Sequence, residues 1–152
     1  MLRIATFKLL LKDLKDNSSN KILGIMTARS EAELSKIVKD ISDFNLIGII
    51  PSSDTDEHSF NNITETDTVV LYVLKPVGDG DRDLEDTTDQ EIAQDIIAGI
   101  KERLYYIAEH CEHALHQTIM ELNFGSMHTD PEYNYMGCDG YSLSFTLKTN
   151  WF

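Results

Sequence analysis

Hydrophobic residues recur at three- and four-residue spacing from Thr88 to about His116, the longest periodic stretch of the chain. This spacing places apolar side chains on one face of a helix and charged side chains on the other. Thr88 and Glu91 have the spacing of a capping box, in which a hydroxyl and a carboxylate each accept a backbone N–H at the helix start. The pattern predicts a long amphipathic helix on which the other elements pack. Its apolar face is expected to include Ile92, Ile96, Ile97, Ile100, Leu104, Ile107, Ala108, Cys111 and Leu115.

Two shorter helices are predicted before the long one. Residues 2–15 place large apolar side chains on one helical face and lysines on other positions. Ser30 and Glu33 form a second capping box, and the apolar residues behind them keep helical spacing. Residues 31–42 are therefore predicted to be helical.

Strands are predicted on both sides of the second helix. KILGIMT at 21–27 is a short β-like run, and FNLIGIIP at 44–51 is a strand that ends at Pro51, because proline cannot donate a ladder hydrogen bond. Residues 52–62 have no period and many turn formers, which predicts an exposed loop.

The clearest strand pattern is TDTVVLYVLKP at residues 66–76. Its apolar side chains occupy both alternating sets of positions, so we expect a central strand that is covered on both faces. The two sets are Val69, Leu71 and Val73, and Val70, Tyr72 and Leu74.

Two further strands are predicted after the long helix, at residues 118–127 and 141–149. Between them, residues 128–140 are rich in turn formers and predict a long loop or a wide hairpin end. The order of elements predicts an α+β fold in a single domain over residues 1–152. We expect a mainly antiparallel four- to five-stranded sheet packed against one long helix, with one or two shorter N-terminal helices.

The composition narrows the classes of partner. The 26 acidic and 13 basic residues give a formal net charge of −13, and an acidic surface repels free nucleic acid and anionic membranes. No apolar run approaches the ~20 residues of a membrane span, and a cytoplasmic origin is expected rather than secretion. Both cysteines are expected to be reduced, with Cys111 on the apolar face of the long helix and Cys138 in a loop.

Three histidines, His110, His113 and His116, crowd the end of the predicted long helix. They advance by three residues, so successive side chains precess ~60° around the helix and do not form the four-residue pair of an HExxH zinc site. We therefore predict solvated histidines favoured by the helix dipole, with no metal. A metal site is the alternative.

An acidic segment joins the central strand to the long helix. Asp79, Asp81 and Asp83 alternate as at the start of an EF-hand calcium loop. Leu84 stands where that loop needs a glycine, and Gln90 stands where it needs a glutamate. A solvated acidic loop is the preferred interpretation, and weak calcium binding is the alternative.

The motifs of common enzymes do not occur in the chain: there is no GxGxxG, GxxxxGK[ST] or GxSxG. We expect a protein with no catalytic residues and no cofactor. The terminal Trp151 and Phe152 either complete the domain's own core or dock on a neighbouring subunit. The residues predicted to form an interface between subunits are Tyr133, Tyr135, Met136, Trp151 and Phe152.

The segment from DTVVLYVLKP, through the acidic turn and the long helix, to ELNFGSM and GYSLSFTLKTN resembles phage tail-terminator and tail-completion proteins and head-to-tail connector rings. The resemblance covers about the last 90 residues and implies a structural virion protein with an α+β fold, located in the tail or neck and assembled in the host cytoplasm. It also implies a ring, a hexamer or alternatively a dodecamer. Such a ring contacts tail-tube or neck and portal proteins while DNA passes without specific binding.

An acidic ring suits this role, because acidic groups at the channel keep the phosphates of passing DNA from binding. The residues predicted to line or rim the channel are Asp79, Asp81, Asp83, Glu85 and Asp86. Two other functions stay open. One is an acidic DNA mimic or inhibitor that binds a basic partner, and the other is a metal-assisted enzyme that uses His110, His113 and His116.

Overall fold

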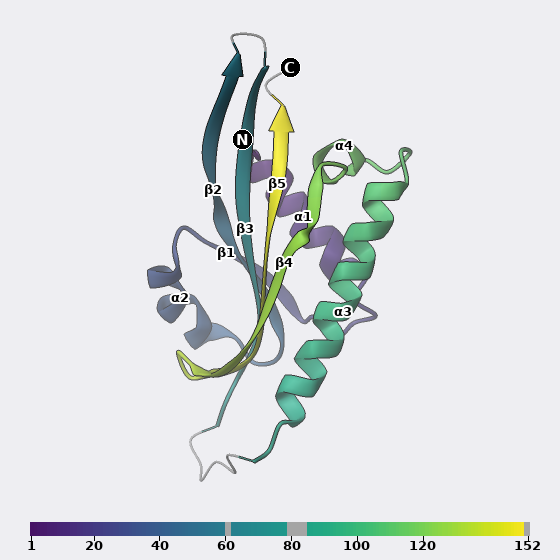
Figure 1. Cartoon of the computed structure of the whole chain (residues 1–152). Coiled ribbons are helices and arrows are strands. Elements are labelled where there is room, and N and C mark those ends of the chain that lie inside the picture. Colours follow the sequence, from purple (N-terminus) through teal and green to yellow (C-terminus); the bar gives the residue numbers. More distant parts are fainter. Residues whose placement is uncertain (60–61, 79–84, 151–152) are drawn as a thin grey trace.

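Within the described residues, five strands form one mixed sheet in the order β1-β2-β3-β5-β4 (Figure 1). The computed structural model describes residues 1–59, 62–78 and 85–150. β1 and β2 are parallel and the other neighbouring strands are antiparallel. The predicted α+β class is confirmed, but the sheet is mixed. The strands are β1 (Gly24–Ala28), β2 (Asn45–Ser59), β3 (Asn62–Pro76), β4 (Leu122–Tyr135) and β5 (Cys138–Asn150).

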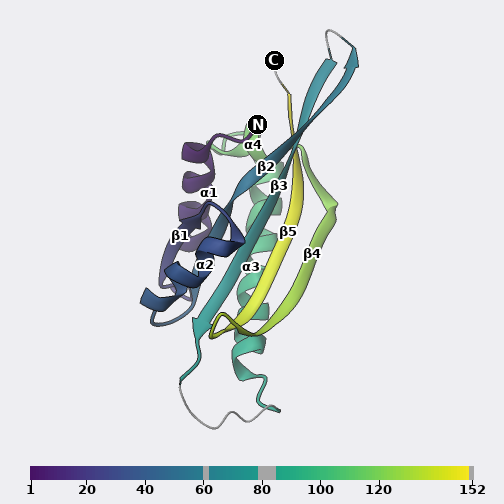
Figure 2. The same ribbon diagram turned by 90° about the vertical axis from the view of Figure 1, so that its left-hand side faces the viewer.

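Helices cover both faces of the sheet to different extents. α1 and α3 lie on one face, whereas α2 lies on the other, near one end of the strands (Figures 1 and 2). The segment containing α2 is the crossover that a parallel β1–β2 pair requires. The helical segments are α1 (Ile4–Asp16), α2 (Glu31–Ile37), the 3₁₀ turn η1 (Val38–Asp40), α3 (Thr88–Glu109) and α4 (His116–Ile119).

The larger core lies between the sheet and the α1–α3 layer. Val69, Leu71 and Val73 of β3 belong to it, as do Leu10 of α1 and Leu104 of α3. α1 is also pressed closely onto the sheet: a Cβ added at Gly48 would lie 2.5 Å from the Phe7 ring. Two helices, α1 and α3, therefore cover this face of the sheet, whereas the sequence predicted that one long helix packs on it.

A second, smaller core lies on the opposite face, under α2 and η1. Tyr72 and Leu74 of β3 pack there against Leu34 and Val38. Both faces of β3 are thus covered near α2, as its two apolar sets predict. Cys138 is buried in this core at the start of β5, so its predicted position in a loop is wrong.

α3 begins where the sequence predicts but ends at Glu109, before His116. His110 takes an extended backbone conformation, and the chain leaves the helix there. Cys111 is consequently exposed, and its predicted place on the apolar face is wrong. The predicted capping box is also absent, because Thr87 is the N-cap and makes no side-chain capping bond.

The first two helices follow the sequence pattern more closely. α1 confirms the helix predicted at residues 2–15. α2 ends at Ile37 and continues as the 3₁₀ turn η1, so the helix predicted over 31–42 is shorter. Ser30 is the N-cap of α2, but its side chain makes no capping bond. The Glu33 carboxylate accepts the N–H of Arg29 at 3.0 Å.

The loop predicted at residues 52–62 is wrong over most of its length. Residues 52–59 continue β2 and pair with β3, and this half of the hairpin projects beyond the helices (Figure 1). Since no helix covers it, no apolar period is required there and the pattern misses the strand. Ile50 and Pro51 form a bulge opposite Val69, a position that tolerates proline.

Most of the predicted loop at 128–140 is also strand, in agreement with the alternative of a hairpin end. β4 runs to Tyr135 and β5 begins at Cys138. The two residues between them, Met136 and Gly137, have φ values of 52° and 80°, the left-handed pair of a type I′ turn. The strand predicted at 118–127 begins later, because residues 116–119 form α4.

β4 carries a wide bulge near its start. Four of its residues, 124–127, lie between the pairs Asn123–Thr146 and His128–Ser144, opposite a single residue of β5. The Ser126 hydroxyl donates to the carbonyl of Asn123 at 2.6 Å and accepts the N–H of Thr146 at 2.9 Å. These bonds hold the bulged backbone and bend the strand (Figure 2). None of the helices in residues 1–59, 62–78 and 85–150 has the length and hydropathy that crossing a bilayer requires.

Candidate functional site

The three histidines near the end of α3 do not form the solvated helix-end group that the sequence predicts. His113 lies past the helix end, with 17% of its side chain exposed. His110 stacks on Tyr106, with 3.8 Å between ring centroids. The Nδ1 atom of His116 lies 3.1 Å from the carbonyl oxygen of Ile107, which can only accept a hydrogen bond. These contacts orient the three rings separately.

His113 joins a polar network that links α1 to α3. Arg103 donates from Nε to Asp13 Oδ1 at 2.8 Å and from Nη2 to Asp13 Oδ2 at 3.0 Å, a bidentate ion pair. His113 Nε2 lies 3.2 Å from the same Oδ2 atom. The guanidinium group also lies 4.8 Å from the centroid of the Tyr106 ring. The network ties the end of α1 to the last turns of α3.

The two ring nitrogens of His113 have different partners in this network. The backbone N–H of Leu115 donates to Nδ1 at 3.1 Å, and Nε2 lies 3.2 Å from both Asp13 Oδ2 and Arg103 Nη2. Burial raises the pKa of Asp13, but the hydrogen bond and charge of Arg103, together with His113, outweigh burial and lower it. Asp13 is thus held ionised as a structural acceptor.

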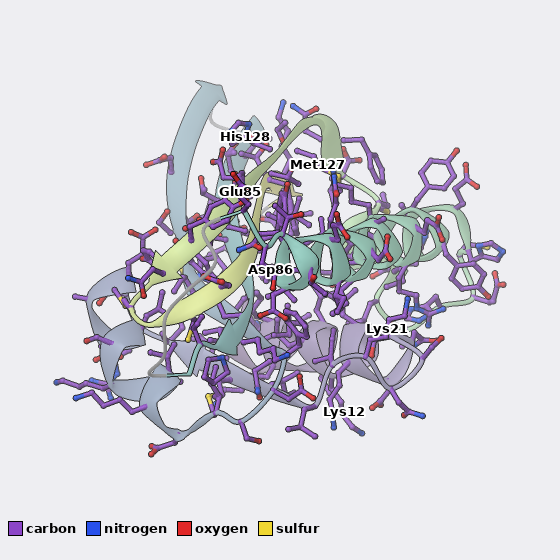
Figure 3. The ribbon with its side chains drawn as sticks, turned by 90° about the horizontal axis from the view of Figure 1, so that it is seen from below. Lys12, Lys21, Glu85, Asp86, Met127 and His128 are labelled. Atoms are coloured by element: carbon purple, nitrogen blue, oxygen red, sulfur yellow. The ribbon has the colours of Figure 1, made fainter. Side chains whose placement is uncertain are left out.

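A metal ion has no evident binding group in the described part of the chain, where no three His, Cys, Asp or Glu side chains come together to hold one. Of the acidic segment predicted to line a channel, Asp79, Asp81 and Asp83 lie outside the described residues. Glu85 and Asp86 are exposed just before α3 (Figure 3). Asp86 accepts the backbone N–H and the hydroxyl of Thr88, and these bonds lower its pKa.

The end of the β4–β5 hairpin combines exposed apolar side chains with carboxylates. Tyr133 is 54% exposed and Met136 is 38% exposed. Tyr135, also predicted at an interface, is half-buried and stacks on Tyr72 at 5.4 Å. Trp151 and Phe152 lie outside the described residues. We call Asp130, Glu132, Tyr133 and Met136 the acidic hairpin surface.

Negative charge is crowded around this hairpin. The Tyr72 hydroxyl donates to Glu31 Oε1 at 2.9 Å. Burial raises the pKa of Tyr72, and its interactions with Tyr135 and Glu31 raise it further. Burial also raises the pKa of Glu132; a hydrogen bond with Ser142 opposes this effect, and the charges of Asp130 and Glu31 add to it. A cationic partner would relieve this repulsion.

A second surface, on α1, was not singled out from the sequence. Residues 1–23 carry five basic and two acidic side chains, so with a net charge of −13 for the chain the remaining residues carry −16. Leu9 is 58% exposed between the exposed Lys8 and Lys12. We call Lys8, Leu9 and Lys12 the basic α1 surface. The signal for it was present in the helical pattern, since Leu9 falls off the apolar face of residues 2–15.

Shallow grooves flank the basic α1 surface on both sides. One, of about 180 Å³, lies between α1 and β1 and is lined by Lys8, Leu11 and residues 25–27. The other, of about 310 Å³, lies between α1 and residues 113–115 and includes Leu9 and Lys12. Figure 3 shows Lys12 on the α1 side of the molecule and Met127 and His128 of β4 on the opposite side.

A scan against protein-family models and a search of the curated proteins returned no match for this chain. The function is therefore inferred from the chemistry of its own surfaces. Two of these surfaces combine charge with exposed apolar side chains: the acidic hairpin surface and the basic α1 surface.

Proposed function

We propose that the protein is a non-catalytic structural subunit that assembles into a homo-oligomeric ring, at the tail end or neck of a tailed phage particle. The observation that carries the proposal is the pair of exposed residues at the acidic hairpin surface, Tyr133 and Met136. Aromatic and methionine side chains are enriched at protein interfaces, and exposed groups of this kind often mark a partner surface. The element order on which the family resemblance rests is present in the structure and supports the same assignment.

The charge of the chain supports passage of DNA through such a ring. A formal net charge of −13 keeps phosphates from binding to a channel wall. Glu85 and Asp86 are exposed just before α3 begins, on the end of the molecule that Figure 3 views from below, where they would rim an opening. The ring is expected to contact tail-tube, neck or portal proteins in the virion, after assembly in the host cytoplasm.

One observation favours a second function, an acidic inhibitor that imitates DNA. Exposed carboxylates follow the outer side of α3 at Glu91, Asp95, Glu102 and Glu109. Such a stripe could engage a basic DNA-binding partner. This function predicts a monomer that binds a basic protein, whereas the proposed function predicts a ring of identical subunits.

Native mass spectrometry with negative-stain imaging of the purified protein tests the proposal. A closed ring, hexameric or dodecameric, is the expected result. A monomer at all accessible concentrations would overturn it.

The channel assignment is tested in particles. Changing Asp79, Asp81 and Asp83 to Asn and Glu85 to Gln should leave the subunit folded, because like charges crowded in one segment repel one another. Particles that carry the change should eject DNA abnormally. Normal infectivity would remove the acidic segment from the channel while leaving the ring intact as a proposal.

A further inference from the structure

We infer that the subunits join head to tail, with the basic α1 surface of one subunit docked on the acidic hairpin surface of the next copy. This inference rests on the proposed ring. It assigns the interface to residues from two distant parts of the chain, Lys8, Leu9 and Lys12 on α1, and Asp130, Glu132, Tyr133 and Met136 on the β4–β5 hairpin.

The α1 side offers positive charge around an apolar centre. Lys8 and Lys12 are one helical turn apart, and Leu9 is 58% exposed beside them. Phe7, Leu10, Leu11 and Leu14 already satisfy the packing of the helix on the sheet. Leu9 therefore has no role in the subunit's own core. The grooves on either side of the helix are open to the side chains of a partner.

The hairpin side offers the complementary features. Asp130, which lies 2.9 Å from His128, and Glu132 supply carboxylates, and two exposed apolar side chains lie beside them: Met136 in the tight turn and Tyr133 three residues before it. The tight two-residue turn leaves the backbone at Met136 little conformational freedom to lose on binding. The raised pKa of Glu132 reflects burial and its acidic neighbours, so lysines from outside would stabilise the charged state of this cluster.

The two surfaces cannot meet within one subunit. α1 packs on the sheet face of Leu71, whereas Tyr135, next to the hairpin turn, packs on the opposite face with Tyr72. Two different patches on different sides of a subunit give a heterologous contact, which closes into a ring when the rotation per subunit divides a full turn. A second copy is the best-matched occupant, because each copy carries both surfaces.

Charge reversal tests the pairing. A donor variant carries Lys8→Glu and Lys12→Glu, and an acceptor variant carries Asp130→Lys and Glu132→Lys. Each variant alone places like charges across every interface, which should weaken subunit association at least ~100-fold. Lys36→Glu with Lys39→Glu is the matched control: it makes the same change in net charge at exposed positions on α2 and η1. The control should still form rings.

Mixing the two variants gives the decisive measurement. In a 1:1 mixture, every contact between a donor variant and an acceptor variant pairs opposite charges again. Native mass spectrometry should then show rings in which the two masses alternate, with an even number of subunits. A single chain that carries all four changes should also form rings. Circular dichroism of each variant checks that the subunits remain folded.

Each outcome bears on a separate claim. If the unmodified protein forms no ring, the proposed function fails. If the ring forms and the donor variant still assembles like the control, this inference fails while the ring stands. If both variants dissociate but the mixture forms no ring, the pairing of these two surfaces is overturned.

The apolar anchors give an independent test if the acceptor variant fails to fold. Tyr133→Ala should weaken association at least ~10-fold, because truncated aromatic anchors cost interfaces most. Tyr105→Ala removes an aromatic of similar exposure from α3 and should leave association unchanged. Equal effects of the two truncations would overturn the assignment of the hairpin surface.

Discussion

The two faces of β3 are built from neighbouring residues, but helices cover them to different extents. On one face, Leu71 lies fully buried beneath α1 and α3, in the larger core. On the other, Tyr72 packs beneath α2, and the same face of β5 carries hydroxyl residues such as Ser144. The first face resembles the interior of a domain. The second is only partly covered, and polar groups reach its margin.

The comparison teaches that the two faces of the sheet contribute differently to the stability of the fold. A polar contact lies on each side of the sheet. The ion pair of Asp13 with Arg103 joins α1 to α3, and the hydrogen bond of Tyr72 with Glu31 joins the sheet to α2. Only the second contact lies close to the acidic hairpin surface. Changes on the α1–α3 face should therefore affect folding most, and changes on the α2 face should affect it less.

Adjacent truncations in β3 test this contrast most directly. Leu71→Ala should lower the free energy of unfolding by ~2–5 kcal/mol, because it leaves a cavity in a closely packed core. Val70→Ala, on the half-buried opposite face, should cost less, roughly 1–2 kcal/mol. Urea unfolding of both variants provides the measurement. Equal losses would show that the two faces are packed alike.

Two glycine substitutions test how closely α1 approaches the sheet. Gly48→Ala places a Cβ 2.5 Å from Phe7 Cζ and 2.9 Å from Leu11 Cδ1, so it should destabilise the fold by ~1–3 kcal/mol through overpacking. Gly99→Ala is the matched control in α3, where a Cβ meets nothing within 4 Å. It should stabilise the protein by ~0.5–1 kcal/mol, since alanine favours a helix interior. Thermal unfolding that moves both variants in the same direction would contradict this description.

The Asp13 network predicts a pH dependence for the α1–α3 side. Because the folded pKa of Asp13 is lowered, its contribution to stability is complete above the unfolded pKa and is lost as the pH falls through the folded pKa. Asp13→Asn should therefore cost ~1.5–2 kcal/mol at pH 7, in the range of charged hydrogen bonds. The difference from the unmodified protein should shrink below about pH 4. Asp16→Asn, at an exposed position of the same helix, serves as the control and should show neither effect.

The smallest effect is expected from the contact that fastens α2. Tyr72→Phe removes the 2.9 Å hydrogen bond to Glu31 but keeps the ring that stacks on Tyr135. We expect a loss of ~0.5–1.5 kcal/mol, because Glu31 is exposed and water can replace the hydroxyl. Hydrogen exchange should show faster opening of residues 31–40 with little change in α3. Uniform acceleration across the chain would show that the α2 contact supports the whole fold.

The strongest hydrophobic periods led to correct elements. α1, the start of α3 and the central position of β3 follow from apolar residues that one or two neighbouring layers must cover. The strand that the pattern missed, at residues 52–59, lies where no helix covers the sheet and no such period is required. There, pairing to a neighbouring strand maintains the strand, and a single-sequence pattern does not contain that partner.

One of the two candidate surfaces was predicted from the sequence, and the other was found only in the structure. Tyr133 and Met136 were predicted at an interface from their type and their loop-forming neighbours, and the structure leaves them exposed. The basic α1 surface was not singled out, because lysines on a helix are ordinarily a solvated face. The structure distinguishes this surface from the acidic rest of the chain, because it shows Leu9 exposed between Lys8 and Lys12.

The sequence by itself determined the α+β class, the acidic character and the two apolar sets of β3, because each depends on residue type and spacing along the chain. Only the tertiary structure decided that β1 pairs in parallel with β2 and that His113 faces Asp13 and Arg103. It also placed the α1 lysines and the acidic hairpin on different sides of the subunit. The reason is that these relations join residues far apart in the chain, such as Asp13 and His113, which are a hundred positions apart. Their separation in space depends on how the layers pack, and local periodicity carries no information about that packing.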